Sequence, residues 1–467
     1  MAAQKHRADL FALIAYTLLA ILLTYPLVLN FATHVPGDGG DDPALAWNLW
    51  WVPHALINLQ QTPIYTQHMF YPIGINLAFY TLTYLNAFLS IPIQSAFNLV
   101  IASNVNVLFS LVMSGFGAYL LVKWLFKSTV NSQQSTVPAF IAGALYAFSA
   151  NKLLYISLGQ FNIASSHWIP FYVLFLLKLT RARHTNRERF ARITNYELRI
   201  GFLLGLFLLF QALSEFIYAS FLILFTALYL VYQLIATRAK LLANYQLLFT
   251  FAIATITFTL PMSPILAAMF QDMATEGDFI QQGLGFADVF SSDALGFFIP
   301  SKLHPVLGGL ESQLHFAYTN FAFLGFAALA FALIALWKIP HARIWGIFGA
   351  IFVLISLGPA LSINGARFDL PLPFDVLLEI PFVKGNRYPS RWSVLVTLAL
   401  AILVGYGIAW ISEKLKIKSA KWARRFTFYV LLFTLFEHLA VLPLSNFQIP
   451  KVYDTIARDT GGATVSV

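Results

Sequence analysis

The sequence contains no cysteine, so disulfide bonds are excluded and the redox environment of the protein cannot be inferred. Charged residues are also scarce. They make up 10% of the 467 residues, whereas a soluble domain has roughly 25%. Hydrophobic residues make up 59% of the chain and aromatic residues 16%. The sequence has no internal repeat and no low-complexity tract. This composition predicts an all-α polytopic membrane protein.

The chain is basic overall, with 29 Lys and Arg against 20 Asp and Glu and a net charge of +9. Such an excess could indicate nucleic-acid binding, but the cytoplasmic loops of a polytopic protein collect Lys and Arg during insertion. Basic residues gather in four short segments, 181–199, 237–240, 337–343 and 413–425. We therefore predict that these segments are cytoplasmic, and we expect no nucleic-acid partner.

Two longer segments have the opposite character. Residues 32–81 contain no Lys or Arg, and residues 266–318 contain six Asp and Glu residues against one Lys. Both are predicted to be extracytoplasmic loops. The first loop follows a basic N-terminus and an apolar run at 9–31, which has no small-residue cleavage site and is predicted to be an uncleaved first span.

Apolar runs of membrane length predict a transmembrane domain at 1–445 with about 11 spans, in the range 11–13. One further run, 82–101, contains Asn86, Pro92, Gln94 and Asn98, and it is predicted not to cross because the charged loops require an odd number of crossings between 81 and 181. The N-terminus is then cytoplasmic and the C-terminus extracytoplasmic, in the cell (inner or plasma) membrane. Residues 446–467, which end in "ATVSV", are expected to begin an extracytoplasmic region that is truncated. The predicted spans are 9–31, 105–126, 138–157, 163–180, 200–213, 216–236, 243–265, 319–338, 343–363, 391–411 and 426–445.

The first outer loop opens with a dense acidic turn, "PGDGGDDP". Asp42 precedes Pro43, which is the pattern of an acidic N-cap followed by proline at the first helical position. One cap serves one helix end, so capping does not explain Asp38 or Asp41. Carboxylates this close repel each other unless a cation, a proton or a cationic group intervenes. We predict a site here, either a general base for an acceptor hydroxyl or a pair that holds a divalent metal, with a solvated acidic turn as the alternative.

The helix expected behind this turn contains Trp47, Trp50 and Trp51 on one face. Tryptophan favours the headgroup region, so this helix is predicted to lie flat on the outer membrane surface. His54 and His68 in the same loop are candidate cavity residues or metal ligands, although isolated loop histidines are more often ordinary polar contacts.

A basic cluster, "PFVKGNRYPSRW" at 381–392, lies on the same predicted outer face, where positive charge is not expected in a short loop. Arginine offers bidentate hydrogen bonds to phosphate oxygens, so Lys384, Arg387 and Arg391 are candidates for binding a lipid-linked phosphate. Snorkelling of these side chains to lipid headgroups is the alternative.

Further residues on this face are weaker candidates for the same cavity. Glu215 is placed at the tip of a hairpin between the spans 200–213 and 216–236. His167 lies in "GQFNIASSHW", and three more candidates, Lys302, His304 and Glu311, lie in the second long loop. Each has a structural role as its alternative.

The chain resembles bacterial-type integral membrane glycosyltransferases of the GT-C superfamily, which use polyprenyl-phosphate-linked sugars. The resemblance rests on "GDGGDDP", "WNLWW", "FYPIGINL", "AGALYAFSANKLLYISLGQFN", "ESQLHFAYTNFAFLG" and "KGNRYPSRWSVLVTLALAILVGYG", which extend over most of the chain.

The resemblance implies a GT-C-like bundle with interfacial helices in the first outer loop. It also implies inverting transfer of a hexose or pentose on the outer face, to a glycan, lipid or protein acceptor. Asp38 and Asp41 match the general base, and Arg387 and Arg391 match the ligands of the donor phosphate. No cofactor is certain, and a divalent metal (Mg or Mn) held by the two aspartates is an open alternative.

Two other classes of function are compatible with the same residues. A lipid-carrier transporter or flippase-like protein would use the charged cavity without chemistry, but it should show repeated halves and charges near the bilayer midplane. A membrane assembly factor would not need the acidic residues at all.

Overall fold

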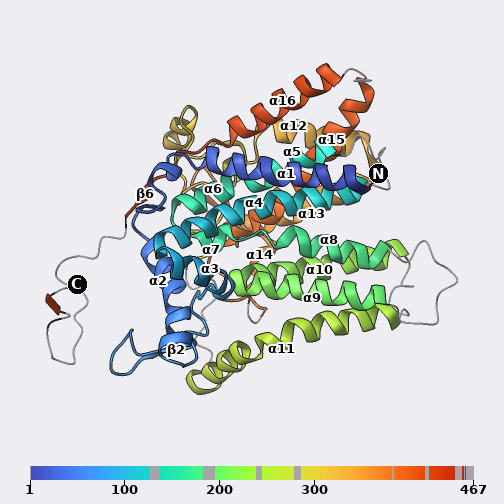
Figure 1. Cartoon of the computed structure of the whole chain (residues 1–467). Helices are drawn as coiled ribbons and strands as arrows, with labels where there is room; N and C mark the ends of the chain where they lie inside the picture. Colours follow the sequence, from blue (N-terminus) through green and yellow to red (C-terminus); the bar gives the residue numbers. More distant parts are fainter. Residues whose placement is uncertain are drawn as a thin grey trace.

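The computed structural model describes residues 2–126, 136–181, 195–237, 245–277, 286–380, 383–415, 420–446, 455–456 and 458. The described chain is mainly a bundle of helices that run in nearly the same direction (Figure 1). These helices are α1 (Ala2–Leu23), α4 (Leu99–Phe126), α5 (Thr136–Ala147), α6 (Ala150–Ser157), α7 (Phe161–Ala164), α8 (Ile169–Arg181), α9 (Asn195–Ser214), α10 (Phe216–Thr237), α11 (Tyr245–Glu276), α12 (Phe326–Lys338), α13 (Arg343–Ser356), α15 (Ser393–Lys414) and α16 (Ala420–Glu437).

Seven segments of the described chain are long and apolar enough to cross a membrane, and 326–338 and 340–356 are shorter apolar helices. The chain is therefore a helical membrane protein, as the composition predicts, while the structure does not fix the number of spans at eleven. The seven segments are 99–126, 136–157, 161–180, 195–214, 216–236, 245–276 and 389–414.

Helix α15 lies at the centre of the bundle and packs against α5, α12 and α13. In its most apolar stretch 89% of the residues are buried, whereas in α11 the share is 17%. Since both helices are apolar, α15 is covered by protein and α11 presents most of its apolar surface outward, as expected of a helix that faces lipid. Figure 1 shows α11 at the edge of the bundle beside α9.

Helix α2 (Asp42–Pro53) lies across one end of the bundle rather than alongside the other helices (Figure 1). It continues as a π-helical turn at His54–Asn58 and is followed by a small hairpin, β2 (Tyr65–Thr66) with β3 (Ile75–Asn76), and by α3 (Tyr84–Ala96). The sequence predicts a helix that lies flat on the outer membrane surface. Its contact with a membrane surface stays a prediction.

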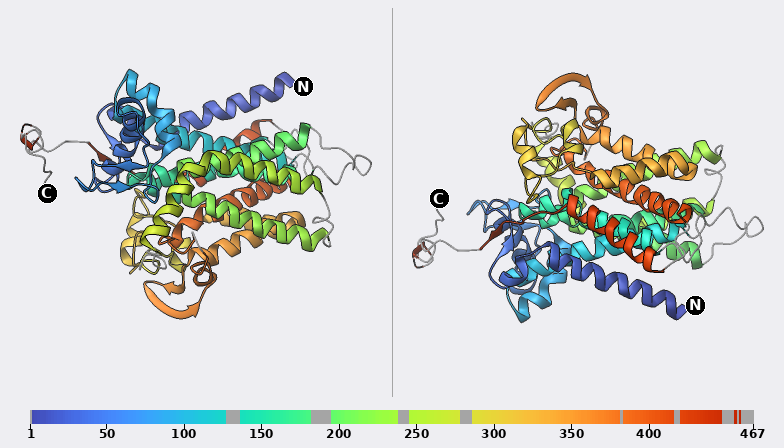
Figure 2. Two further views of the ribbon diagram at one scale, coloured as in Figure 1. Left: turned by 90° about the horizontal axis from the view of Figure 1, so that it is seen from below. Right: turned by 90° about the horizontal axis from the view of Figure 1, so that it is seen from above.

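The other long connections lie at the same end of the bundle. Figure 2 shows the segment around residue 300 and the hairpin of β4 (Ala360–Ile363) with β5 (Ala366–Pro371) on the side of the first loop, away from the N-terminus. Short helical turns lie in these connections. They are η1 (Leu27–Asn30), η4 (Ala294–Phe298), η5 (Gly308–Gln313), α14 (Pro373–Leu377) and η7 (Pro389–Trp392), whereas η6 (Pro340–Ala342) lies in the short link between α12 and α13.

The first loop is joined to the end of the last helix by two short strands. β1 (Val35–Pro36) pairs antiparallel with β6 (Leu444–Ser445). Figure 1 places β6 at the opposite end of the bundle from the N-terminus. A chain that starts at one end and finishes at the other has crossed an odd number of times, which agrees with the parity predicted from loop charge. The orientation of the two ends in the cell is not given by this arrangement.

The structure also tests the predicted helix boundaries. Of the segment 82–101, residues 84–96 form the 13-residue helix α3, which contains Pro92, and residues 99–101 begin α4. Helix α3 is not among the helices of the described chain that are long and apolar enough to cross a membrane. The predicted spans 319–338 and 343–363 are shorter in the structure, since α12 begins at Phe326 and α13 ends at Ser356. The strand predicted at "ATVSV" lies outside the described residues.

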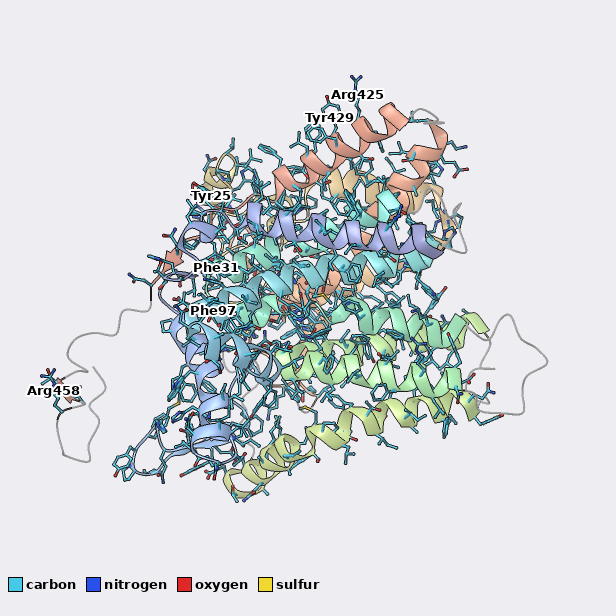
Figure 3. All side chains as sticks on the ribbon, in the orientation of Figure 1. Tyr25, Phe31, Phe97, Arg425, Tyr429 and Arg458 are labelled. Atoms are coloured by element: carbon cyan, nitrogen blue, oxygen red, sulfur yellow. The ribbon has the colours of Figure 1, made fainter. Side chains whose placement is uncertain are left out.

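Aromatic side chains surround the end of the bundle that carries the first loop. Figure 3 shows Tyr25, Phe31 and Phe97 there, and Tyr25 and Phe97 are exposed. Aromatic rings are enriched where a membrane protein leaves the bilayer, so these side chains agree with a membrane–water boundary at this level. On α16, Tyr429 also points outward (Figure 3).

Candidate active site

The acidic turn is built around Asp42, whose predicted role as the N-cap is wrong. The N-cap of α2 is Asp41, whose side chain makes no capping hydrogen bond, and Asp42 is already inside the helix. Asp42 is only 3% exposed, and its Oδ1 accepts a hydrogen bond of 2.8 Å from the backbone N–H of Gly39. The proline after Asp42 occupies the second helical position, so the sequence pattern locates the helix start to within one residue.

Glycines surround the buried Asp42 carboxyl group. A β-carbon at Gly37 would lie 2.6 Å from the Asp42 carboxyl, and one at Gly159 would lie 2.4 Å from the Asp42 β-carbon. Gly159 also has a φ of +73°, which side-chain-bearing residues rarely adopt. The acidic turn therefore packs closely on the connection between α6 and α7, where the Gly159 backbone contacts Asp42.

Asp38 and Asp41 point away from this core and are exposed. Oδ1 of Asp38 accepts a 3.1 Å hydrogen bond from the backbone N–H of Gly40. Oδ2 of Asp41 accepts a 2.5 Å hydrogen bond from the side-chain amide of Gln160, at the start of α7. Two carboxylates thus stand at the surface of the turn while the third anchors it.

The three tryptophans of α2 contact each other and the two loop histidines. The Trp47 and Trp51 rings stack with centroids 5.4 Å apart, and the Trp50 ring stacks on His54 at 4.4 Å. Trp51 is fully buried and its Nε1–H donates to a backbone carbonyl, so it is not available to lipid headgroups. The His68 ring lies 5.9 Å from that of His54 and completes the cluster.

The basic cluster precedes the central helix α15. The guanidinium carbons of Arg387 and Arg391 lie 5.1 Å and 4.1 Å from the centre of the Tyr388 ring. Within the described chain neither arginine forms an ion pair, and Nε of Arg391 is buried without a hydrogen-bond partner. Two cations held against one ring without carboxylate partners are suited to binding an anion.

Both arginines line a cavity of about 530 Å³. Its volume falls within the roughly 300–1,000 Å³ of small-molecule sites. One wall is apolar and includes Met262, Ile265 and Met269 of α11. The remaining lining residues come from the first loop, the α9–α10 junction and 385–391; they are Ala78, Phe79, Tyr80, Thr81, Leu82, Tyr84, Ala212, Ser214, Glu215, Phe216, Ile217, Ser220, Gly385, Asn386, Arg387, Tyr388 and Arg391.

Several buried polar atoms face this cavity without a protein partner. Within the described chain, no hydrogen bond is formed by three of these groups: the hydroxyls of Tyr84 and Ser214 and the side-chain NH2 of Asn386. Buried polar groups are costly unless they are paired, so these atoms are ready to bind water or the hydroxyl groups of a ligand.

Two tyrosines connect the acidic turn to the cavity. Burial raises the pKa of Tyr80, which lines the cavity, and the negative charge of Asp41 raises it further. Burial also raises the pKa of Tyr318, with smaller contributions from Tyr388 and from Asp41 and Asp38, while Arg391 opposes the shift. Tyr318 therefore lies within electrostatic range of both the acids and the basic cluster.

Glu215 lies between α9 and α10 and lines the same cavity. It lies at the turn between the two helices, as predicted, and it is buried there; its Oε2 accepts a 2.6 Å hydrogen bond from the side chain of Asn162. Burial raises the pKa of Glu215, and the Arg391 charge and the Asn162 hydrogen bond oppose this shift. A carboxyl and a guanidinium thus line the same cavity and interact electrostatically.

The other candidates lie elsewhere. His304 accepts backbone N–H groups at Nδ1 and contacts the Phe436 carbonyl at 2.7 Å through Nε2, and Glu311 accepts the backbone N–H groups of Lys302 and Asn320. These contacts organise the second long loop. His167 is buried against aromatic rings in the bundle, and Lys384 is half-buried next to the cavity lining.

The donor set for a metal ion is limited. Within the described residues, no three His, Cys, Asp or Glu side chains are grouped so that they could hold a metal ion. Asp38 and Asp41 offer two carboxylates, and Mg²⁺ is often bound by one or two carboxylates together with substrate phosphate oxygens. The acidic turn fits such an arrangement only if the substrate supplies further oxygens.

Comparison with solved structures identifies the fold. The chain is similar to the archaeal oligosaccharyltransferase AglB from Archaeoglobus fulgidus, solved in complex with an inhibitory peptide and a dolichol-phosphate, with a TM-score of 0.50 and 14% sequence identity. The similarity covers 98% of this chain and 59% of that one, so this chain spans about three fifths of the length of its relative. No protein-family model and no curated protein sequence matches the chain. The predicted resemblance to GT-C proteins is thus confirmed at the level of the fold.

Proposed function

We propose that the protein is a membrane glycosyltransferase that transfers one sugar from a polyprenyl-phosphate-linked donor to a lipid, glycan or protein acceptor. The observation that carries this proposal is the cavity that Arg387 and Arg391 line together with Tyr80, whose pKa is raised by burial and then by the charge of Asp41 in the acidic turn. The GT-C fold supports the proposal, because its solved relative is an oligosaccharyltransferase bound to a dolichol-phosphate. The donor sugar is a hexose or a pentose.

In the proposed reaction the acceptor hydroxyl attacks the anomeric carbon of the donor sugar from the face opposite the phosphate. A carboxylate takes the hydroxyl proton as the new C–O bond forms, and the bond between the anomeric carbon and the phosphate oxygen breaks. The polyprenyl phosphate leaves with the bonding electron pair, and the anomeric configuration is inverted.

Arg387 and Arg391 are assigned to the donor phosphate. Negative charge develops on the leaving phosphate during transfer, and preorganised guanidinium groups stabilise it without reorganisation. The Tyr388 ring holds both cations at one place in the cavity wall. The apolar wall on α11 is suited to the polyprenyl chain, because that helix also faces lipid.

Asp41 is assigned as the general base. Of the two exposed acids, it is the one whose charge acts on both Tyr80 and Tyr318, and its orientation is fixed by Gln160. Asp38 is the second acid of the site. Asp42 stabilises the turn by accepting a hydrogen bond from the backbone N–H of Gly39. Where a divalent ion is bound, Asp38 and Asp41 would hold it, and it would neutralise phosphate charge.

The proposal places the cavity on the extracytoplasmic face of the cell membrane. The basic segments would then be cytoplasmic, with eleven spans, a cytoplasmic N-terminus and an extracytoplasmic C-terminus. The odd parity of the bundle supports this assignment.

Incubation of the purified protein with a panel of polyprenyl-phosphate sugars, with and without Mg²⁺, tests the proposal. Wild-type protein is expected to release sugar to water or to an acceptor, and Asp41→Asn is expected to reduce release by at least about 100-fold, because a general base contributes this much. Asp369→Asn is the matched control, since Asp369 lies on β5 with a side chain that is 99% exposed.

Three outcomes would count against this proposal. The first is sugar release that is unchanged in both Asp38→Asn and Asp41→Asn, which would overturn the assignment of the acidic turn as the source of the general base. The second is tight donor binding with no turnover on any donor, and the third is movement of the lipid across vesicles without bond cleavage. The last two would favour a carrier or flippase-like protein instead.

A further inference from the structure

A single short segment, Gly159–Asn162, contacts both sides of the site. We infer that this segment is a positioning device in which Gln160 orients the Asp41 carboxylate and Asn162 orients the Glu215 carboxyl group. The inference rests on the proposed function. It states that the segment "GQFN" fixes the orientation of the general base relative to the acid that lines the cavity.

Gln160 acts on Asp41 through one hydrogen bond. Its Nε2 lies 2.5 Å from Oδ2 of Asp41, and the Gln160 side chain is buried while the Asp41 side chain is exposed. An exposed carboxylate rotates freely unless it is held, and a buried amide that cannot take the proton is suited to holding it. With Oδ2 occupied by the amide, Oδ1 is the oxygen left to accept the proton of an acceptor hydroxyl.

Asn162 acts on Glu215 in the same way, two residues further along the chain. Its Nδ2 lies 2.6 Å from Oε2 of Glu215, and both side chains are buried. Because Glu215 lines the cavity with Arg391, this contact fixes one acceptor group of the cavity wall. We assign Glu215 to the hydroxyl groups of the donor sugar, next to the unpartnered Ser214 hydroxyl.

The backbone that follows this segment, at the end of α7, is held by side chains from other helices. The carbonyl of Ala164 accepts hydrogen bonds from Ser110 Oγ at 2.6 Å and from Lys152 Nζ at 2.9 Å, and the carbonyl of Ser165 accepts one from Gln211 Nε2 at 2.9 Å. Irregular backbone inside a helical membrane protein is tolerated where its polar groups are satisfied by protein. Side chains from α4, α6 and α9 therefore hold the connection between α7 and α8 in place.

The close approach of Gly159 to Asp42 fixes the other end of the segment. Asp41 in the acidic turn and Glu215 in the cavity wall thus both accept hydrogen bonds from side chains of this one short segment. Catalysis depends on such fixed distances, because a shift of about 1 Å can cost roughly 100-fold in rate. The segment contributes geometry and does not itself touch the reacting atoms.

The test compares Gln160→Ala and Asn162→Ala in sugar-release kinetics across a pH series. For Gln160→Ala we expect kcat to fall roughly 10- to 100-fold with donor KM little changed. The acidic limb of its kcat/KM profile should move to higher pH, because a carboxylate that loses a donor binds its proton more tightly. For Asn162→Ala we expect a rise in donor KM with the acidic limb unmoved.

Gln94→Ala is the matched control. Like Gln160, Gln94 donates a hydrogen bond from its side-chain amide, but its acceptor is the backbone carbonyl of Leu49 and not a carboxylate. It should leave kcat, KM and the pH profile unchanged. Equal effects of Gln160→Ala and Gln94→Ala, or a Gln160→Ala profile with an unmoved acidic limb, would overturn the inference while leaving the proposed function intact.

A structure of Gln160→Ala determined by cryo-electron microscopy gives a readout that does not need turnover. The inference expects the Asp41 carboxylate to leave its wild-type position, and an unmoved carboxylate overturns it. If the wild-type protein releases no sugar from any donor, the proposed function fails, and the position of Asp41 in this structure still decides whether Gln160 orients it.

Discussion

Gly159 and Asp42 are separated by 117 positions in the sequence, yet a β-carbon at Gly159 would lie 2.4 Å from the β-carbon of Asp42. This contact joins the first outer loop to the connection between α6 and α7. It brings the exposed Asp41 within reach of Gln160, the residue next to Gly159. The acidic turn is therefore positioned by a close backbone approach that only glycine permits.

Gly159→Ala is expected to damage the site more than a typical glycine substitution. The new β-carbon would collide with Asp42, and the φ of +73° adds a cost of roughly 1–2 kcal/mol for a side-chain-bearing residue. We expect loss of sugar release together with a lower melting temperature in detergent. Gly309→Ala is the control, because nothing lies within 4 Å of that position, and it should be nearly neutral. Equal effects of the two substitutions would contradict the packing described here.

Arg391→Lys keeps the positive charge but removes the planar fork and its stacking on Tyr388. A hydrogen bond to a charged group contributes about 1.5–3 kcal/mol, so kcat/KM for the donor should fall roughly 10- to 100-fold. Initial rates at varied donor concentration measure this change. Arg367→Ala, in an exposed ion pair on β5, should leave the rates unchanged. An Arg391→Lys protein with wild-type kcat/KM would argue against a role in phosphate binding.

The sequence predicted the helical membrane fold and the resemblance to GT-C proteins, and it singled out the acidic turn and the basic cluster as candidate sites. Periodicity and loop charge carry this information locally, so Asp41, Arg387 and Arg391 could be selected without coordinates. The prediction that 82–101 does not cross rests on its polar residues and on the parity of the charged loops. These features depend on residues close together in the chain.

The contacts between distant segments could not be predicted. Gln160 and Asn162 appear in the sequence as ordinary residues of an apolar stretch, and only the fold brings them to Asp41 and Glu215. Asp42 was predicted to be the N-cap of α2, but it lies inside the helix and is buried among glycines. His304 and Glu311 were selected by residue type, whereas their contacts serve the loop in which they lie.

The buried ion pair between Asp9 and Lys123 joins α1 to α4 and is shared by the Tyr119 hydroxyl. Asp9→Asn leaves the Lys123 charge without its partner in a poorly solvated place. Because the pair is partly accessible, we expect a loss of about 2 kcal/mol, between the values for exposed and fully buried pairs. Thermal unfolding in detergent measures it. Arg367→Ala should cost less than about 1 kcal/mol, because its ion pair with Asp288 is exposed.

The double variant Asp9→Asn with Lys123→Met removes the unpaired charge as well. It should recover most of the stability, since apolar replacement of a buried pair is often neutral. If the single and double variants are equally unstable, lost packing rather than the unpaired charge causes the effect.

Glu215→Gln tests the electrostatics of the cavity by its dependence on pH. Burial raises the pKa of Glu215 above its unfolded value of about 4.5, with Arg391 and Asn162 opposing the shift. A raised pKa means that the folded state holds the proton more tightly than the unfolded state does. The contribution to stability is therefore complete below about pH 4.5 and is lost as pH rises through the folded pKa.

Glutamine keeps the acceptor oxygen for Asn162 but carries no titrating proton, so its contribution does not change with pH. The unfolding free energy of Glu215→Gln relative to wild type should therefore increase as pH rises above about 4.5, measured by thermal or denaturant unfolding at each pH. Glu311, whose pKa burial also raises, is present in both proteins and cancels in the difference. A difference that stays constant over the series would mean that Arg391 and Asn162 fully offset the burial of this carboxyl group.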